Sequence, residues 1–346
     1  MLFANTRLVV AGVGMTWRES RPSGVSLLKH RSMKANEPSP SEYHIPVLLP
    51  EVLHFMAPEK GKLLVDGTLG GGGHTEALLT AGADVIGIDQ DEQALAHAGA
   101  RLVDFSDRFT ALKGNFATMP QLLAEAGYDQ VDGILVDIGV SSWQLDEADR
   151  GFSFGKDGPL DMRMDRDSGQ TAADLVNTAS EQELKSIFYE YGEERASSKI
   201  VRRIVERRES QPFLATLDLA DFISSILPRG GKSHPATRVF QALRIAVNDE
   251  LGVLKELLAS ASSMLRPGGR LGVITFHSLE DRLVKQFFKH ASQPQIDRKE
   301  WPEPKGNPDY CYKLLTRRPV TAGADELKKN RRSRSAKLRV VEKITI

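Results

Sequence analysis

The segment Val65-Asp66-Gly67-Thr68-Leu69-Gly70-Gly71-Gly72-Gly73-His74 constrains the fold of this chain more than any other. A short apolar run at 62–65 leads into it, and a helical pattern through Ala77, Leu78 and Leu79 follows it. This pattern predicts a strand, a turn and the start of a helix. Four successive glycines leave the turn without side chains, so a ligand can approach its backbone closely. The helix start offers free N–H groups and a positive dipole end, which predicts a nucleotide-type cofactor site.

Short apolar segments alternate with helical patterns on the C-terminal side of this turn. Strands are predicted over residues 63–66, 84–89, 109–112, 131–137 and 271–276, with two closing strands over 314–316 and 337–344. Helices are predicted over 92–102 and 279–290, and a further helical pattern runs through Leu265 and stops at Pro267-Gly268-Gly269. Short apolar strands between helices imply a mostly parallel sheet that is covered on both faces. Residues 291–309 are predicted to form a loop.

The α/β rhythm is interrupted between residues 147 and 240, where helical patterns occur without a strand signal. We therefore predict an all-helical domain, 147–240, inserted into a discontinuous α/β domain made of 41–146 and 241–346. We predict that residues 1–40 form a separate extension with a Pro-Ser linker at its end.

The N-terminal extension is rich in basic residues. Up to Met33 it contains a single acid, Glu19, against five basic residues: Arg7, Arg18, Arg21, Lys29 and Arg31. Such a composition is typical of organelle transit peptides. A disordered extension, or a start nearer Met33, accounts for it as well, and we favour this interpretation. The expected location is cytoplasmic, or mitochondrial if 1–33 is a transit peptide.

Composition excludes several classes of protein. The 346 residues carry a formal net charge of zero, so a nucleic-acid partner would need local basic patches. Cys311 is the only cysteine, which excludes an intrachain disulfide framework and a thiolate metal cluster. The sequence has no apolar run long enough to span a membrane, and we expect no membrane partner.

The residues after the glycines narrow the choice of cofactor. A mononucleotide P-loop requires Lys and Ser or Thr after its last glycine, but His74-Thr75 follows Gly73. A dinucleotide fingerprint is incomplete, because Thr75 stands at its third glycine position. Asp89 ends the second predicted strand, where a carboxylate can accept both ribose hydroxyls of an adenosine. The alternative is that Asp89 only caps the next helix.

Two further acids end predicted strands at the same edge of the sheet. Asp66 precedes the glycine turn and Asp137 ends the fourth strand. Ligands of open α/β sheets bind along this edge. Three carboxylates there suit a cofactor that carries positive charge, and S-adenosylmethionine has a sulfonium and an ammonium but no phosphate. Asp66 could instead orient the turn. These residues favour S-adenosylmethionine over a nicotinamide cofactor.

Several long motifs resemble one family, that of ribosomal RNA small subunit methyltransferase H. The resemblance covers residue 43 to the C-terminus, and its motifs lie at 44–53, 66–74, 137–146, 150–154, 158–165, 234–245, 276–281 and 334–339. It implies a class I S-adenosylmethionine-dependent methyltransferase, Rossmann-like with a mostly parallel seven-stranded sheet, in which 147–240 recognises the substrate. The sequence departs from the family's pattern at Pro50 and in the run 328–333.

The resemblance also implies an activity and a set of contacts. This family methylates N4 of a cytidine, position 1402, in the decoding centre of 16S rRNA. The cofactor contacts that it implies are Gly72, Gly73, His74, Asp89, Phe116, Asp137 and Gln144. The implied partner is 16S rRNA or the small ribosomal subunit. Whether the protein forms a homodimer is left open. Alternatives are another RNA, such as organellar small-subunit rRNA, a non-catalytic assembly factor, or a nicotinamide dehydrogenase on the same fold.

Asp137 is the candidate catalytic residue. Methyl transfer from a sulfonium is an in-line displacement, and an acceptor for the N4–H groups would localise the nitrogen lone pair. Asp137, or backbone carbonyls in the turn after it, could serve as this acceptor. Methylation at C5 of cytosine would need a thiolate, but Cys311 lies outside every motif. His277 invites a zinc interpretation, yet Asp281 stands where a second histidine would be required, so we predict no metal.

Two basic stretches could hold RNA phosphates, each with a solvated charged surface as the alternative. The first lies at 195–208 and is interspersed with acids, whereas the second, at 328–339, has fewer acids and is the better candidate. Trp143, Phe152 and Phe154 could stack on a flipped base, although core packing explains them equally well.

Overall fold

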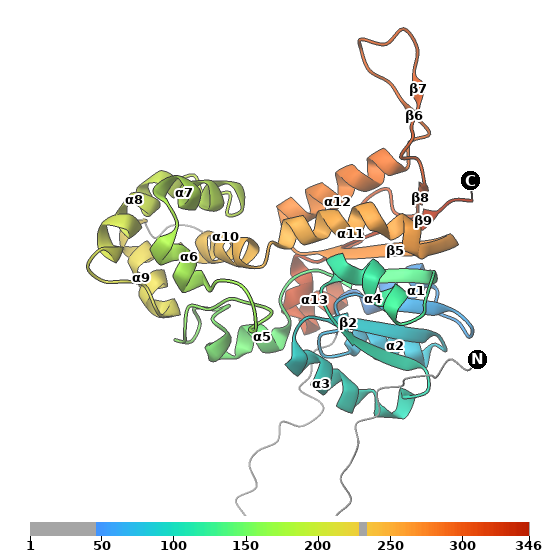
Figure 1. Ribbon diagram of the computed structural model, residues 1–346, viewed down its shortest axis with the longest axis horizontal. Helices are drawn as coiled ribbons and strands as arrows, with labels where there is room; N and C mark the ends of the chain where they lie inside the picture. Colours follow the sequence, from blue (N-terminus) through green and yellow to red (C-terminus); the bar gives the residue numbers. More distant parts are fainter. Residues whose placement is uncertain (1–45, 228–233, 346) are drawn as a thin grey trace, which may run out of the picture. The chain divides into compact units, whose positions relative to one another are not determined.

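A computed structural model of the protein describes residues 46–227 and 234–345 (Figure 1). The predictions for the extension and for the first two residues of motif 44–53 lie outside this range. All described residues belong to one compact unit. Among the helices described, none has the length and apolar character needed to cross a bilayer.

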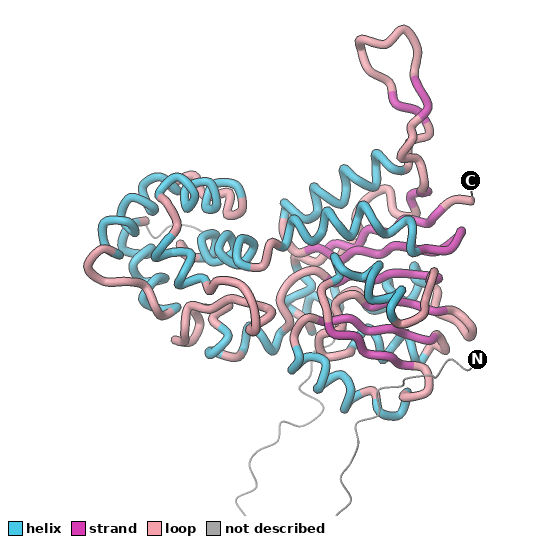
Figure 2. The backbone as a smooth tube through the Cα atoms, viewed as in Figure 1, coloured by secondary structure: helices cyan, strands magenta, loops and turns pink. Residues whose placement is uncertain are grey.

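A seven-stranded sheet lies at the centre of the α/β part (Figure 2). Its strand order is β3-β2-β1-β4-β5-β9-β8. The strands are β1 Leu63–Asp66, β2 Asp84–Asp89, β3 Phe109–Lys113, β4 Val131–Asp137, β5 Leu265–Thr275, β8 Tyr312–Leu314 and β9 Lys337–Lys343. Strands β1 to β5 pair in parallel, whereas β9 runs antiparallel to both β5 and β8. The predicted mostly parallel sheet is confirmed.

Alternate side chains of each strand pack on opposite faces of the sheet, as the period of two requires. Leu64 and Leu135 belong to one buried cluster, and Val65 and Val136 to another. The first face is covered by α1 Leu49–Met56, α2 Gly73–Thr80 and α3 Glu92–Arg101. The second is covered by α4 Met119–Glu125, α11 Glu250–Met264 and α12 Ser278–Ala291. Burial on both faces explains why these strands read as continuous apolar runs.

The order of the strands defines where a ligand can bind. From β1 the chain proceeds to β2 and β3 on one side, and then returns to place β4 on the other side of β1. Strands β1, β2 and β4 are parallel, so their carboxyl ends meet at one edge. This reversal leaves a crevice beyond the strand ends, and it brings Asp66, Asp89 and Asp137 to the same edge.

The segment between β4 and β5 is helical. Its helices before α11 are α5 Ser142–Asp146, α6 Ala172–Thr178, α7 Glu181–Glu190, α8 Ser197–Arg208, α9 Thr216–Ile226 and α10 Thr237–Val247. They share a buried cluster that includes Phe188, Ile204 and Phe213. Helix α10 continues past residue 240, where the insertion was predicted to end. The division into domains therefore stays a prediction.

The predicted boundary between α11 and β5 is wrong. The helix ends at Met264, and Leu265 already has extended backbone and pairs with Val131. Regular pairing resumes with Arg270 opposite Gly133, so Pro267-Gly268-Gly269 forms an irregularity inside β5 rather than a stop before it. Leu265 is buried in the same cluster as the helix, and an apolar pattern alone does not separate the two conformations.

Three further predictions near the C-terminus need correction. Residues 291–309 are not only loop, because β6 Gln295–Ile296 pairs with β7 Lys305–Gly306 in a short antiparallel ladder. Strand β8 lies at Tyr312–Leu314 rather than 314–316, and β9 ends at Lys343. Between them the sequence reasoning missed α13 Ala324–Lys329 and a 3-10 helix, η5 Arg331–Arg334. These elements span only two to seven residues, so they leave little periodicity to detect.

Candidate active site

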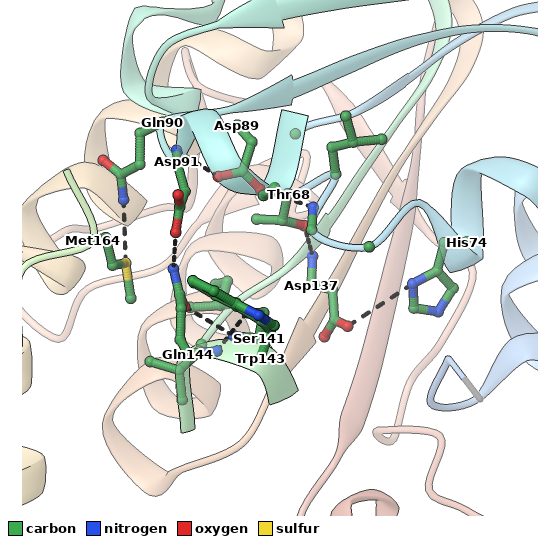
Figure 3. A pocket seen from close by; sticks show the side chains of 18 of the residues that line it. Thr68, His74, Asp89, Gln90, Asp91, Asp137, Ser141, Trp143, Gln144 and Met164 are labelled. Atoms are coloured by element: carbon green, nitrogen blue, oxygen red, sulfur yellow. Dashed lines mark hydrogen bonds and ion pairs between the residues drawn. The ribbon is translucent and has the colours of Figure 1, made fainter. Parts of the chain in front are cut away.

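A cavity of about 680 Å³ opens at the carboxyl ends of β1, β2 and β4 (Figure 3). Six of the seven predicted cofactor-binding residues line it: Gly73, His74, Asp89, Phe116, Asp137 and Gln144. The seventh, Gly72, is not among its lining residues. The topology thus brings together side chains from four separate parts of the sequence.

The glycine turn is shaped by its protein neighbours as well as by access for a ligand. Gly72 has a φ of 76°, in the left-handed region, and a Cβ there would lie 3.2 Å from Leu102 Cδ1. At Gly73, a Cβ would lie 3.3 Å from the ring of Pro46. Gly72 therefore sets the turn that starts α2, whereas Gly70 and Gly71 present their backbone to the cavity.

Asp66 orients the turn instead of facing the cavity. Its carboxylate accepts hydrogen bonds from the Thr75 hydroxyl at 2.7 Å and from the Thr68 N–H at 3.2 Å. The side chain is buried, and burial raises its pKa above the usual value. Asp66 is not a lining residue of the cavity, and of the interpretations left open above, the structure favours the orienting role.

Asp89 lines the cavity at the end of β2. Its two oxygens accept the N–H groups of Gly70 at 2.8 Å and Asp91 at 2.9 Å. Each carboxylate oxygen has two acceptor positions, so capacity for two hydroxyl donors remains. Burial raises the pKa of Asp89 to about 6, with the nearby carboxylates of Asp91 and Asp66 adding to the rise.

Asp137 lies at the end of β4, about one quarter exposed. Its Oδ1 is buried and has no hydrogen-bond partner among the described residues. Its Oδ2 lies 3.9 Å from His74 Nδ1, while His74 Nε2 contacts the Val47 carbonyl at 2.9 Å. Burial raises the pKa of Asp137 to about 7 despite the histidine. An unpartnered buried carboxylate oxygen attracts a cation or a hydrogen-bond donor.

Phe116 and Gln144 line the cavity in different ways. Phe116 begins the 3-10 helix η3 Phe116–Thr118, packs against the core and lines the cavity, so its contact with a cofactor stays a prediction. Gln144 caps α5 by accepting the Ser141 N–H at 3.0 Å, and its amide donates to Asp91 Oδ2 at 3.1 Å. Internal contacts hold the Gln144 amide in place at the cavity wall.

Other residues of the cavity wall were not predicted. Arg244 and Glu250 form a bidentate ion pair, with N···O distances of 2.7 and 2.8 Å. Both residues line the cavity together with Phe276. The six-residue spacing of this pair spans the junction between α10 and α11, so no single helix period could reveal it. Of the candidate aromatic residues, Trp143 lines the cavity. Phe152 and Phe154 pack in the helical cluster instead.

A group of three side chains near the cavity could hold a metal ion. Ligand atoms of Glu250, His277 and Glu280 all lie within 4.8 Å of one another. Both oxygens of Glu250 are already bonded to Arg244, and His277 Nε2 lies 2.8 Å from Glu280 Oε1. The prediction of no metal stays a prediction.

The two basic stretches differ in their position relative to the cavity. In α8, Arg207 pairs with Asp218 at 2.6 Å and Arg203 with Glu206 at 2.8 Å. In the C-terminal stretch, Arg339 pairs with Asp281 at 2.7 Å and Arg332 with Asp146 at 3.4 Å, and Arg332 also lines the cavity. The second stretch therefore borders the site directly.

These features define a class of protein. A seven-stranded sheet with one antiparallel strand, acidic strand ends and a glycine turn is the class I S-adenosylmethionine-dependent methyltransferase fold, Rossmann-like in its parallel part. Burial raises the pKa values of Asp89 and Asp137, and a cationic cofactor beside these carboxylates would stabilise their ionised forms. S-adenosylmethionine, with its sulfonium and ribose hydroxyls, matches both carboxylates.

The chain belongs to the MraW methylase family, whose model matches residues 41–344. It is 52% identical over 305 residues to ribosomal RNA small subunit methyltransferase H of Carboxydothermus hydrogenoformans, covering 87% of this chain and 98% of that protein. The protein of the same name from Geobacter sp. strain M21 is 52% identical over 308 residues, covering 87% and 99%. An rRNA methylase structure from Streptococcus thermophilus aligns with a TM-score of 0.36 at 11% identity, covering 86% of this chain and 94% of that one. That last likeness is too weak to bear on function.

Proposed function

We propose that this protein transfers a methyl group from S-adenosylmethionine to N4 of a cytidine in small-subunit rRNA, at position 1402 of the decoding centre. Family membership and the names of relatives at 52% identity support an rRNA substrate. The observation that carries the choice of atom is Asp137 Oδ1, a buried acceptor without a partner among the described residues, beside the glycine turn. An exocyclic amino group offers the N–H donor that this oxygen lacks.

The cofactor supplies an electrophilic methyl group on a positively charged sulfur. Asp89 would accept the ribose hydroxyls, and Phe116 would pack beside the adenine. Asp137 accepts an N–H of the target amine, which concentrates the nitrogen lone pair for in-line attack on the methyl carbon. As the N–C bond forms and the C–S bond breaks, the amine becomes cationic, and its extra proton passes to Asp137 or to water.

The position of Cys311 favours an amino group over a ring carbon as the acceptor. Methylation at C5 of a pyrimidine requires a thiolate that adds to the ring. Cys311 packs against the sheet core and is not a lining residue of the cavity. Burial raises the pKa of its thiol, which disfavours the thiolate. This cysteine is unsuited to that chemistry.

The RNA would reach the cavity between the helical segment 147–240, as the substrate-recognition part, and the basic stretch 328–339. Arg332 at the cavity wall and the exposed Lys329 and Arg334 suit phosphate contacts. The partner would be 16S rRNA or the assembled small subunit.

Incubation of the full-length protein with methyl-deuterated S-adenosylmethionine and unmethylated small ribosomal subunits tests the proposal. Mass spectrometry of the digested rRNA should find labelled N4-methylcytidine at a single site, and the Asp137→Asn variant should form little. Label on a ring carbon, on ribose or in no nucleoside would contradict it.

A further inference from the structure

Arg150 is a buried cation outside the cavity that contacts two parts of its wall, at Asp91 and at Met164. It ends the 3-10 helix η4 Ala148–Arg150, is 2% exposed, and is not itself a lining residue. One guanidinium nitrogen donates to Asp91 Oδ2 at 2.6 Å. The second terminal nitrogen donates to the carbonyl oxygens of Arg163 at 3.1 Å and Met164 at 3.0 Å, whereas the buried Nε has no partner among the described residues. A buried guanidinium is tolerated only when it is paired in this way.

On the cofactor side, Arg150 acts through Asp91. Asp91 caps α3 by accepting the Gln93 N–H at 3.1 Å, and its own N–H donates to Asp89 Oδ1. Its Oδ2 also accepts the Gln144 amide at 3.1 Å (Figure 3). The oxygen that accepts from Arg150 therefore binds a second donor. Asp91 therefore joins Arg150 to the carboxylate proposed to hold the ribose.

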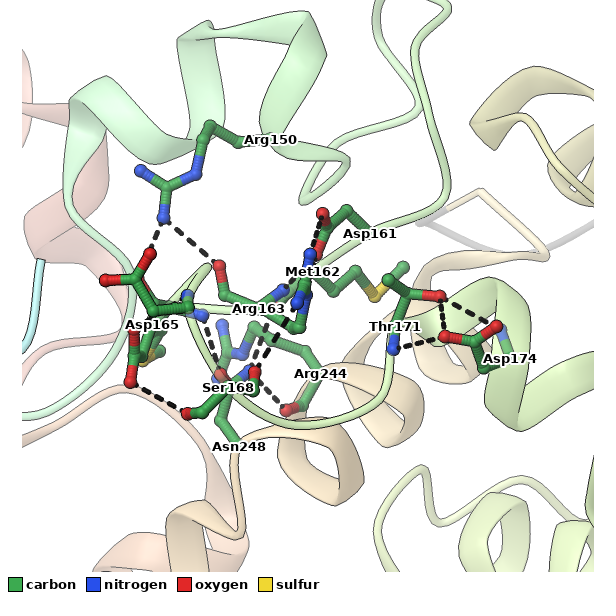
Figure 4. Close-up of polar contacts among 12 residues, drawn as sticks. Arg150, Asp161, Met162, Arg163, Asp165, Ser168, Thr171, Asp174, Arg244 and Asn248 are labelled. Carbon is green, nitrogen blue, oxygen red and sulfur yellow. Dashed lines mark hydrogen bonds and ion pairs between the residues drawn. The ribbon is translucent and has the colours of Figure 1, made fainter.

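On the opposite side, Arg150 holds the segment 161–168, which we call the strap (Figure 4). Asn248 bonds the strap from the other direction, accepting the Met164 N–H at 2.8 Å and donating to the Met162 carbonyl at 2.8 Å. Met162 has a φ of 64°, a conformation that costs a non-glycine residue free energy and persists where surrounding contacts impose it. The Met164 side chain lines the cavity, and its sulfur accepts from the Gln90 amide at 3.1 Å.

We propose that Arg150 is a positioning residue for the cofactor: through Asp91 and the Met164 carbonyl it sets the distance between the Asp89 edge of the cavity and the strap. A planar guanidinium can bond the carboxylate and both carbonyls at once, whereas the single ammonium of lysine cannot span them in the same geometry. This inference rests on S-adenosylmethionine as the cofactor but not on the identity of the RNA.

The test compares two arginine-to-lysine variants of the full-length chain. Arg150→Lys changes the proposed positioning residue. Arg207→Lys is the matched control, because Arg207 also pairs with an aspartate, Asp218, at 2.6 and 2.7 Å and stacks on Phe213, yet none of the three lines the cavity. Calorimetry with S-adenosylhomocysteine gives Kd, methylation of small-subunit rRNA gives KM for S-adenosylmethionine and kcat, and thermal melts give Tm.

For Arg150→Lys we expect Kd and KM for the cofactor to rise about tenfold or more, with a much smaller change in kcat, because ground-state positioning is lost. Arg207→Lys should lower Tm and leave the Kd for S-adenosylhomocysteine, measured without RNA, unchanged. Equal effects of the two variants on Kd, or no effect of Arg150→Lys, would overturn the inference. Failure of the wild-type protein to bind S-adenosylhomocysteine would remove the cofactor assignment and the inference together.

Hydrogen exchange on the wild-type protein keeps the inference testable if Arg150→Lys does not fold. Binding of S-adenosylhomocysteine should slow exchange of the amides of 162–168 and leave those of α8 unchanged. Exchange in the strap that does not respond to the bound compound would contradict a connection between the strap and the cofactor.

Discussion

Asp137 lies where it can contact a ligand, but burial disfavours the ionised form of its carboxylate. Its carboxylate ends β4 inside the cavity, and burial together with the neighbouring Asp66 and Glu280 raises its pKa to about 7. The unfolded chain ionises this group near 3.8, so the native state binds the proton more tightly. Ionisation therefore destabilises the free native protein above pH 7, and this penalty disappears below the unfolded value. A bound sulfonium would offset it.

The Asp137→Asn variant should consequently be more stable and less active. At pH 8 we expect its free energy of unfolding without cofactor to exceed that of the wild type by roughly 1–4 kcal/mol, the equivalent of one to three pKa units. The difference should vanish near pH 4. Methylation should fall by about 10²-fold or more. Denaturant titrations at the two pH values measure the stability, and a variant no more stable at pH 8 would contradict this account of Asp137.

The pH dependence of the wild-type enzyme follows from the same group. Protonation removes the acceptor for the target amine, so kcat/KM should decrease as the pH falls through about 7. Steady-state rates between pH 5.5 and 9 (a range of about 1.5–2 units on either side of the expected pKa) provide the profile. A profile that stays flat down to pH 5.5 would exclude Asp137 as the ionising group.

At the scale of elements, the glycine turn and α2 show what the sequence could and could not predict. The strand, the turn and the helix start followed from local pattern, and β1 and β2 lie at their predicted bounds. The distinct roles of the glycines did not, because they depend on Leu102 and Pro46, which pack against the turn from elsewhere in the chain. The roles of Asp66 and Asp91 likewise depend on partners that only the folded chain brings together.

Gly72→Ala distinguishes a conformational role of Gly72 in this turn from a direct contact with the cofactor. The left-handed backbone and the contact with Leu102 should lower the stability of the protein by about 1–2 kcal/mol. Because Gly72 does not line the cavity, the loss of cofactor affinity should be small compared with that of Asp89→Asn. Thermal melts and calorimetry with S-adenosylhomocysteine measure the two effects. A large loss of affinity at unchanged Tm would instead make Gly72 a direct cofactor contact.

At the scale of the whole molecule, the parallel sheet and the position of its acidic edge were predictable because buried strands and strand-end residues carry strong local signals. The part of the cavity wall that lies outside β1, β2 and β4 was not predictable from the sequence. Arg244, Glu250, Phe276 and Arg332 come from segments whose place in the fold is set by long connections, and no spacing along the chain joins them to β1.

A ligand that binds only the native state stabilises the whole chain. At about 100 times its Kd, S-adenosylhomocysteine should add about 2.7 kcal/mol to the free energy of unfolding and raise Tm accordingly. NAD at the same concentration should leave Tm unchanged, because the third glycine of the dinucleotide fingerprint is Thr75 here. A comparable shift with NAD would favour the dehydrogenase alternative.

Calorimetric titration of the full-length protein with S-adenosylhomocysteine, alongside Asp89→Asn, tests the central claim that the acidic edge of this sheet holds an adenosine-bearing sulfonium cofactor. We predict one binding site per chain, with affinity reduced about tenfold or more in Asp89→Asn, because charge-assisted bonds to the ribose hydroxyls are lost. A folded wild-type protein that takes up none of the compound, or an Asp89→Asn variant that binds it equally well, would contradict the claim.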